Sequence, residues 1–106
     1  MDVGAVLIKL KPDSLSNVDK WKKELQERKN EAIQTLIAEG VYVESWFHIE
    51  LEGQDYLLAY MRANDISHAQ KIAKTSPFDI DKVHKKFKEN WEKGYKATLL
   101  IDLENS

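Results

Sequence analysis

The sequence predicts an α+β domain in which a four-stranded antiparallel sheet carries helices on one face. The chain has 106 residues, of which 42% are hydrophobic and 32% are charged, and this is the size and composition of one globular domain. Segments with strand periodicity alternate with amphipathic segments of helical periodicity. No repeat, low-complexity run or linker divides the chain, so we expect a single domain over residues 1–103 and a polar tail over residues 104–106.

The first half of the chain predicts a strand, a helix and a second strand. Residues 3–11 (VGAVLIKLK) are rich in aliphatic residues, are too short for a typical helix and end at a proline-containing turn. We expect one long helix between Ser16 and Gly40, because its apolar residues share one arc of the helical wheel and glycine often ends a helix. Residues 41–51 alternate in polarity and predict the second strand.

The second half predicts a hairpin partner, two helices and a last strand. A turn containing Gly53 leads into a strand over residues 56–62. A short helix follows, and a Ser-Pro pair separates it from a helix that begins near Asp79 and ends at Gly94. Residues 97–103 (ATLLIDL) predict the final strand. The order is therefore βαββαβ with the second helix split in two, which is the ferredoxin-like plan.

The first and last predicted strands are apolar on both of their alternating sides. In the first strand, Ala5 and Leu7 alternate with Val6 and Ile8. Helices cover only one face of such a sheet, and an exposed apolar face in a small protein is an interaction surface. Packing against a second copy covers that face. We therefore predict a homodimer through the sheet faces.

Composition excludes several classes of protein. The chain has no cysteine, so it has no disulfide framework, no thiolate nucleophile and no cysteine-based metal site. Sixteen basic and eighteen acidic residues give a net charge of −2, which offers no general attraction for nucleic acid or a membrane surface. No apolar stretch is long enough to span a bilayer. We expect a cytoplasmic protein without a metal, a cofactor, a membrane partner or a nucleic-acid partner.

Polar residues on faces that should be buried are the candidates for chemistry, because burying an unpaired charge is costly. His84 lies on the same side of the last predicted helix as Ile80 and Phe87. A neutral imidazole at this place can act as a general acid or base near neutral pH. The alternative is a partly buried structural histidine bonded to a backbone carbonyl.

A second group of candidates surrounds Glu44. It shares a strand face with Trp46 and His48, where a carboxylate beside an aromatic wall can have a raised pKa or bind a hydroxyl group. The alternative is a solvent-facing charge on an edge strand. Arg28 flanks the apolar arc of the first helix, from which it can pair with Glu44 or with a ligand carboxylate, or extend into solvent.

The other face of the third strand carries Tyr56, Tyr60 and Arg62, which line a pocket or fill the dimer interface. A two-residue turn is expected to pair Tyr60 with Phe47. This pairing places the tyrosines on the face opposite Glu44, so the two groups cannot line one pocket within a protomer. We favour the Glu44 face for the pocket.

Three segments, EGVYVESWF (39–47), DYLLAYM (55–61) and FDIDKVHKKF (78–87), resemble an uncharacterised bacterial family of about this length. The whole chain resembles the dimeric α/β-barrel superfamily, in which two ferredoxin-like protomers close their sheets into a barrel. That superfamily includes cofactorless monooxygenases, muconolactone-type isomerases, sugar mutarotases, haem-binding proteins and stress-response proteins, so the fold selects no activity. The resemblance implies a pocket between helices and sheet. L-rhamnose mutarotases carry a catalytic histidine on the first helix, which residues 17–39 lack.

The function predicted from these observations is binding of a small molecule between helices and sheet, by an isomerase- or mutarotase-like enzyme or a cofactorless oxygenase-like enzyme. In this hypothesis His84 is the acid or base and Glu44 is its partner carboxylate. Arg28, Trp46 and His48 contact the substrate. The alternatives are a non-catalytic ligand-binding or regulatory dimer that uses the same pocket, and a structural dimer with no enclosed pocket.

Overall fold

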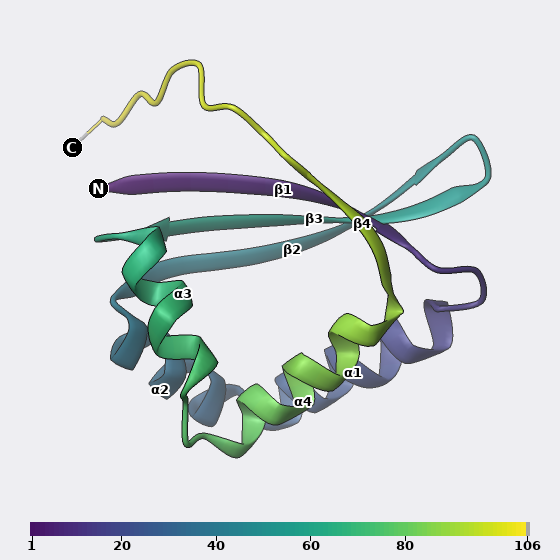
Figure 1. The fold of residues 1–106 in the computed structure, drawn as a ribbon, viewed down its shortest axis with the longest axis horizontal. Coiled ribbons are helices and arrows are strands. Elements are labelled where there is room, and N and C mark those ends of the chain that lie inside the picture. The colour runs from purple at the N-terminus through teal and green to yellow at the C-terminus, as the bar shows by residue number, and fades with distance from the viewer. Residues whose placement is uncertain (106) are drawn as a thin grey trace.

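The structure, a computed structural model, describes residues 1–105. Its elements are β1 (Asp2–Leu10), α1 (Leu15–Glu27), α2 (Lys29–Glu39), β2 (Val41–Leu51), β3 (Gln54–Ala63), α3 (Ile66–Lys74), α4 (Asp79–Phe87), a 3₁₀ turn (Lys88–Asn90) and β4 (Trp91–Lys96). The strands form one antiparallel sheet in the order β2-β3-β1-β4. Figure 1 shows the sheet almost edge-on with α1 to α4 on one side of it. The predicted α+β, ferredoxin-like plan is confirmed.

The long helix predicted between Ser16 and Gly40 is interrupted in the structure. Arg28 leaves helical geometry, with φ −111° and ψ 34°, and separates α1 from α2. The break allows α1 to pack beside α4 while α2 packs beside α3. Gly40 ends α2 in the left-handed conformation, with φ 72°, as expected of a glycine at that position.

The end of the chain differs from the prediction. The last helix ends at Phe87, and the final strand is Trp91–Lys96, where the sequence predicts the end of a helix. Residues 97–103 carry no regular secondary structure, although their composition favours a strand. The reason is tertiary: Trp91 lies opposite Leu10 and joins the core, so the pairing with β1 begins earlier in the chain.

The β2–β3 hairpin closes through a two-residue turn, Glu52 and Gly53, whose φ angles are 50° and 76°. Positive φ at both positions is the geometry that matches the twist of an antiparallel hairpin. Tyr60 lies opposite Ser45, so the predicted pairing with Phe47 is wrong by two residues. A shift of two keeps every side chain on its predicted face, because strand side chains alternate with a period of two.

The core forms two clusters between the helices and the sheet. The cluster around α1 and α4 contains Ile8, Leu10, Val18, Trp21, Leu57 and Phe87, with Trp46 and Trp91 packed against it. The cluster around α3 and the start of β2 contains Val41, Ala63 and Ala69. Apolar side chains therefore cover the helix-facing side of the sheet in two separate regions, one under α1 and α4 and one under α3.

The face of the sheet away from the helices remains uncovered in the single chain. Phe47 of β2 is 53% exposed on this face. Residues 97–105 leave the sheet on the same side, away from the helices (Figure 1). Arg62 holds them there by donating to Asp102 at 2.7 Å and to Glu104 at 2.6 Å, while Leu100 stays 92% exposed. Within residues 1–105, no helix is long and apolar enough to cross a membrane.

Candidate functional site

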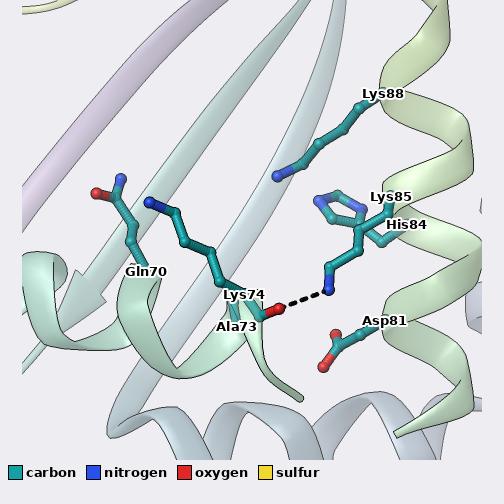
Figure 2. A pocket seen from close by; sticks show the side chains of 7 residues that line it. All are labelled: Gln70, Ala73, Lys74, Asp81, His84, Lys85 and Lys88. Atoms are coloured by element: carbon teal, nitrogen blue, oxygen red, sulfur yellow. Dashed lines mark hydrogen bonds between the residues drawn. The ribbon is translucent and has the colours of Figure 1, made fainter. Parts of the chain in front are cut away.

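A cavity of about 820 Å³ lies between the helix-facing side of the sheet and helices α2, α3 and α4. The residues that give it chemical character are Glu39, Glu44, Trp46, Asp81, His84, Lys88 and Trp91. A hollow of about 260 Å³ between α3 and α4 shares five lining residues with the cavity, among them Asp81, His84 and Lys88, and we call it the mouth. Figure 2 shows these three side chains extending from α4 and the turn after it, opposite Gln70 of α3.

His84 is held in one orientation at the boundary between mouth and cavity. The indole nitrogen of Trp21 donates to His84 Nδ1 at 3.3 Å, so Nδ1 is unprotonated and Nε2 carries the proton of the neutral ring. Trp46 and Trp91 pack around the imidazole with ring-centre distances of 5.4 and 6.1 Å. Burial lowers the pKa of His84 to about 4, and the charge of Lys88 acts in the same direction. The ring is therefore neutral near pH 7.

Two glutamates on adjoining elements have raised pKa values. Burial, with repulsion from Asp81 and Glu44, raises the pKa of Glu39 to about 7, and Lys88 opposes this rise. Burial also raises the pKa of Glu44, against a hydrogen bond from the Trp46 side chain. Glu39 is the last residue of α2 and Glu44 lies in β2, so Gly40 turns the chain between the two carboxyl groups.

Asp81 adds a third carboxylate to the cavity. Its Oδ2 is buried and accepts no hydrogen bond from any residue in the range 1–105. Asp81 and His84 are three positions apart on α4, the spacing that places two side chains on one helix face. The sequence carries this signal for Asp81 in its spacing from His84, whereas the position of Glu39 at the end of a helix gives no local signal that its side chain lines a cavity.

Arg28 does not line the cavity. Its guanidinium donates to Glu24 at 2.9 Å, to Glu31 at 2.6 Å and to Asp79 at 3.1 Å. Glu31 also accepts from the backbone N–H of Ile80 at 3.1 Å, which satisfies a free donor in the first turn of α4. Arg28 thus joins the α1–α2 junction to the start of the helix that carries His84. Its guanidinium N–H groups are engaged in these hydrogen bonds.

His48 also lies away from the cavity. Its Nε2 is 2.9 Å from Asp55 Oδ1, near the exposed end of the β2–β3 hairpin. The structure therefore brings together three of the predicted site residues, His84, Glu44 and Trp46, and places Arg28 and His48 elsewhere. Glu44 and Trp46, from the strand face favoured by the sequence, line the cavity, and Tyr60 of β3 lines it as well, which the sequence did not predict.

A protein-family model described as a family of unknown function (DUF6176) matches residues 1–106. This chain belongs to that family. A search of curated proteins found no significant match. The fold of this DUF6176 member is shared by tetracenomycin F2 cyclase from Streptomyces glaucescens, a type II polyketide cyclase, with 14% identity, a TM-score of 0.65 and full coverage of both chains.

A dimeric ferredoxin-like protein from an uncultured marine organism also shares the fold, with 14% identity and a TM-score of 0.62 over 98% of this chain and 91% of that one. At this level of identity the two likenesses concern the fold alone. They agree with the predicted ferredoxin-like fold.

Proposed function

We propose that this protein binds a small organic molecule in the cavity and catalyses a proton-transfer reaction on it, of the kind that an isomerase or mutarotase performs. One observation carries the proposal: Glu39, Glu44 and His84 have perturbed pKa values and line the same cavity. Titratable groups with shifted pKa values in one cleft mark candidate catalytic sites. The cavity volume also lies in the range of ligand pockets.

Glu39 is the group best suited to move a proton. General acid–base catalysis is most effective when the pKa of the group lies near the working pH, and Glu39 meets that condition with its pKa of about 7. His84 takes a different role from the one predicted from the sequence, because its pKa of about 4 makes the imidazole a weak base at neutral pH. Its Nε2–H instead donates a hydrogen bond to a substrate oxygen.

The tryptophans give the cavity an apolar side. Trp46 and Trp91 both line it, and aromatic rings pack against the ring faces or carbon skeletons of organic ligands. A fold shared with a type II polyketide cyclase agrees with chemistry on small organic molecules in such a cavity.

A ligand screen followed by turnover assays tests the function. Thermal shift against monosaccharides, aromatic acids and quinones identifies the ligand class, because a ligand that binds the native state raises its stability. We then expect Glu39→Gln to reduce turnover at least about 100-fold, within the range that general acid–base catalysis supplies, and to keep ligand binding. Glu27→Gln, on the exposed side of α1, is the control. Turnover unchanged in Glu39→Gln contradicts its role, and binding without turnover supports a ligand-binding module instead.

We further propose that two copies associate through the uncovered face of the sheet. The support is the exposure of large apolar side chains on that face and on the segment that follows β4, including Phe47 at 53% and Ile101 at 71%. Exposed apolar patches of this kind mark interaction surfaces. One structural neighbour with this fold is a dimer.

A further inference from the structure

Lysines outnumber carboxylates at the mouth of the cavity, where the only acidic residue in the lining, among residues 1–105, is Asp81. Lys74, Lys85 and Lys88 line the mouth together with Gln70, whereas Glu39 and Glu44 line only the larger cavity. Figure 2 shows the side chains of Gln70 and Lys74 extending from α3 toward the space that Lys88 enters from the other side. The lining of the mouth therefore holds three ammonium groups and the carboxylate of Asp81, which leaves a net positive charge there.

These lysines are not paired with carboxylates. Within residues 1–105, neither Lys74, Lys85 nor Lys88 forms an ion pair, whereas Lys9 contacts Glu92 at 3.1 Å. Lys85 Nζ donates to the backbone carbonyl of Lys74 at 3.1 Å, which ties α4 to the end of α3. Lys74 and Lys88 thus have no carboxylate within ion-pair distance among residues 1–105, although the charge of Lys88 acts on the two glutamates of the cavity from farther away.

Lys88 is also tied to the wall of the cavity. Its Nζ lies 5.4 Å from the ring centre of Trp91, within the distance of a cation–π contact. Trp91 lines the cavity, so an anion that pairs with Lys88 lies next to an aromatic surface against which the rest of a ligand can pack. The same wall carries Trp46, whose ring centre is 6.0 Å from that of Trp91.

We propose that the mouth, formed by Lys74, Lys85, Lys88 and Gln70, is a subsite for an anionic group, a carboxylate or a phosphate, on the molecule that the cavity binds. The proposal rests on the proposed function and names the class of its substrate, a small organic acid or phosphate ester. The anionic end stays at the mouth because the ammonium groups of Lys74, Lys85 and Lys88 lie there and outnumber the carboxylate of Asp81. The uncharged end then reaches past His84 toward the two glutamates.

This subsite takes the role that the sequence assigned to Arg28. The guanidinium of Arg28 already pairs with three carboxylates, so it offers no free donor fork to a ligand. Ammonium groups bind carboxylates and phosphates as point charges and need no planar partner geometry. The amide of Gln70 supplies an additional hydrogen-bond donor at the same place.

Aromatic probes that differ only in charge test the subsite. Benzoate, phenyl phosphate, uncharged benzamide and cationic benzylamine are titrated against the full chain, with tryptophan fluorescence and the NMR signals of the His84 ring as readouts. We expect benzoate or phenyl phosphate to bind at least about fivefold more tightly than benzamide, and benzylamine to bind least. The more tightly bound of the two anions identifies the natural group as a carboxylate or a phosphate.

Charge-removing variants locate the effect. Lys74→Gln and Lys88→Gln together should weaken binding of the preferred anion about tenfold and leave benzamide binding unchanged. Lys82→Gln is the matched control, because Lys82 is an exposed lysine of α4 that does not line the mouth. Loss of affinity in Lys82→Gln equal to that in the double variant overturns the assignment.

The remaining outcomes separate this proposal from the proposed function. If benzamide or benzylamine binds as tightly as the anions, the subsite is wrong while the cavity remains a ligand site. If neither benzoate nor phenyl phosphate changes the tryptophan fluorescence or the NMR signals of the His84 ring, the subsite is also wrong. The turnover assay that compares the wild-type protein with Glu39→Gln then tests the proposed function independently, since it does not use these probes.

Discussion

The chemistry of the candidate site is set by what surrounds each titratable side chain. Burial lowers the pKa of His84 and raises the pKa of Glu39, because a low-dielectric environment disfavours the charged form of either group. It makes the histidine harder to protonate and the carboxyl group harder to ionise. The same cavity therefore holds a neutral hydrogen-bond donor and a carboxyl group that titrates near neutral pH.

We predict that these two residues affect stability with opposite dependence on pH. Unfolded His84 binds a proton near pH 6.5, but the folded protein binds it only near pH 4, so His84 lowers the free energy of unfolding as pH falls through this window. The full effect is about 3 kcal/mol. Glu39 does the reverse: the folded state keeps its proton up to about pH 7, the unfolded state only to about 4.5, and stability is lost as pH rises.

Urea unfolding of single variants between pH 4 and pH 8 separates the two contributions. His84→Gln should remove the loss of stability on the acid side, and Glu39→Gln should remove the loss on approaching neutral pH. His68→Gln, which alters an exposed histidine of α3, should leave the wild-type profile. If His84→Gln loses as much stability as the wild-type protein when the pH falls from 6.5 to 4, His84 is not desolvated in the folded state.

At the scale of elements, α4 connects the core to the site. Ile80 is 2% exposed and Phe87 belongs to the core cluster, while Asp81 and His84 line the cavity. One helix can do both because residues three and four apart share a face. The bonds of Arg28 to its three carboxylates anchor the start of this helix to the α1–α2 junction. The break at Arg28 is thus part of what positions His84.

The β2–β3 hairpin offers a prediction about its turn. Gly53→Ala should lower the free energy of unfolding by about 1 kcal/mol, because φ of 76° strains a residue that has a Cβ. No atom lies within 4 Å of that Cβ, so the effect comes from the backbone alone. Glu52→Asn should instead raise stability by a few tenths of a kcal/mol, since Asn tolerates positive φ best. Urea midpoints measure both, and equal midpoints for the two variants contradict the turn geometry.

At the scale of the whole molecule, the single chain covers its sheet on one side only. The helices lie over the face that carries Ile8 and Leu57, while Phe47 and the segment after β4 remain exposed on the other side (Figure 1). Burying this surface against a second copy gains hydrophobic stabilisation at a rate of roughly 25 cal/mol per Å². Association through this face leaves the mouth, which lies between α3 and α4, open to ligands.

We predict that sedimentation equilibrium will find a dimer of 12.3 kDa chains. Phe47→Glu should shift the protein toward the monomer, because it places a charge within the buried interface. Ile37→Glu is the matched control: Ile37 is 66% exposed, more than Phe47, but lies on α2 in the helix layer. A monomeric wild-type protein, or equal dissociation in both variants, contradicts association through the sheet.

The sequence by itself determined the fold class and the side on which each strand residue lies. Strand alternation placed Glu44 and Trp46 on one face of the sheet and Tyr60 on the other. These face assignments hold despite an error of two residues in the register, because side chains along a strand alternate with a period of two. Helical spacing likewise placed His84 on the inner side of its helix. These features depend only on local periodicity, which a single sequence carries.

Only the tertiary structure decided which elements end where and which charges meet. The final strand begins at Trp91 because that side chain packs into the core, and local composition does not encode this contact. Arg28 faces three carboxylates on three different elements, so its partners could not be read from α1 alone. Glu39 of α2 acquires its raised pKa from burial and from Asp81, which lies on α4. Such contacts depend on how distant segments pack.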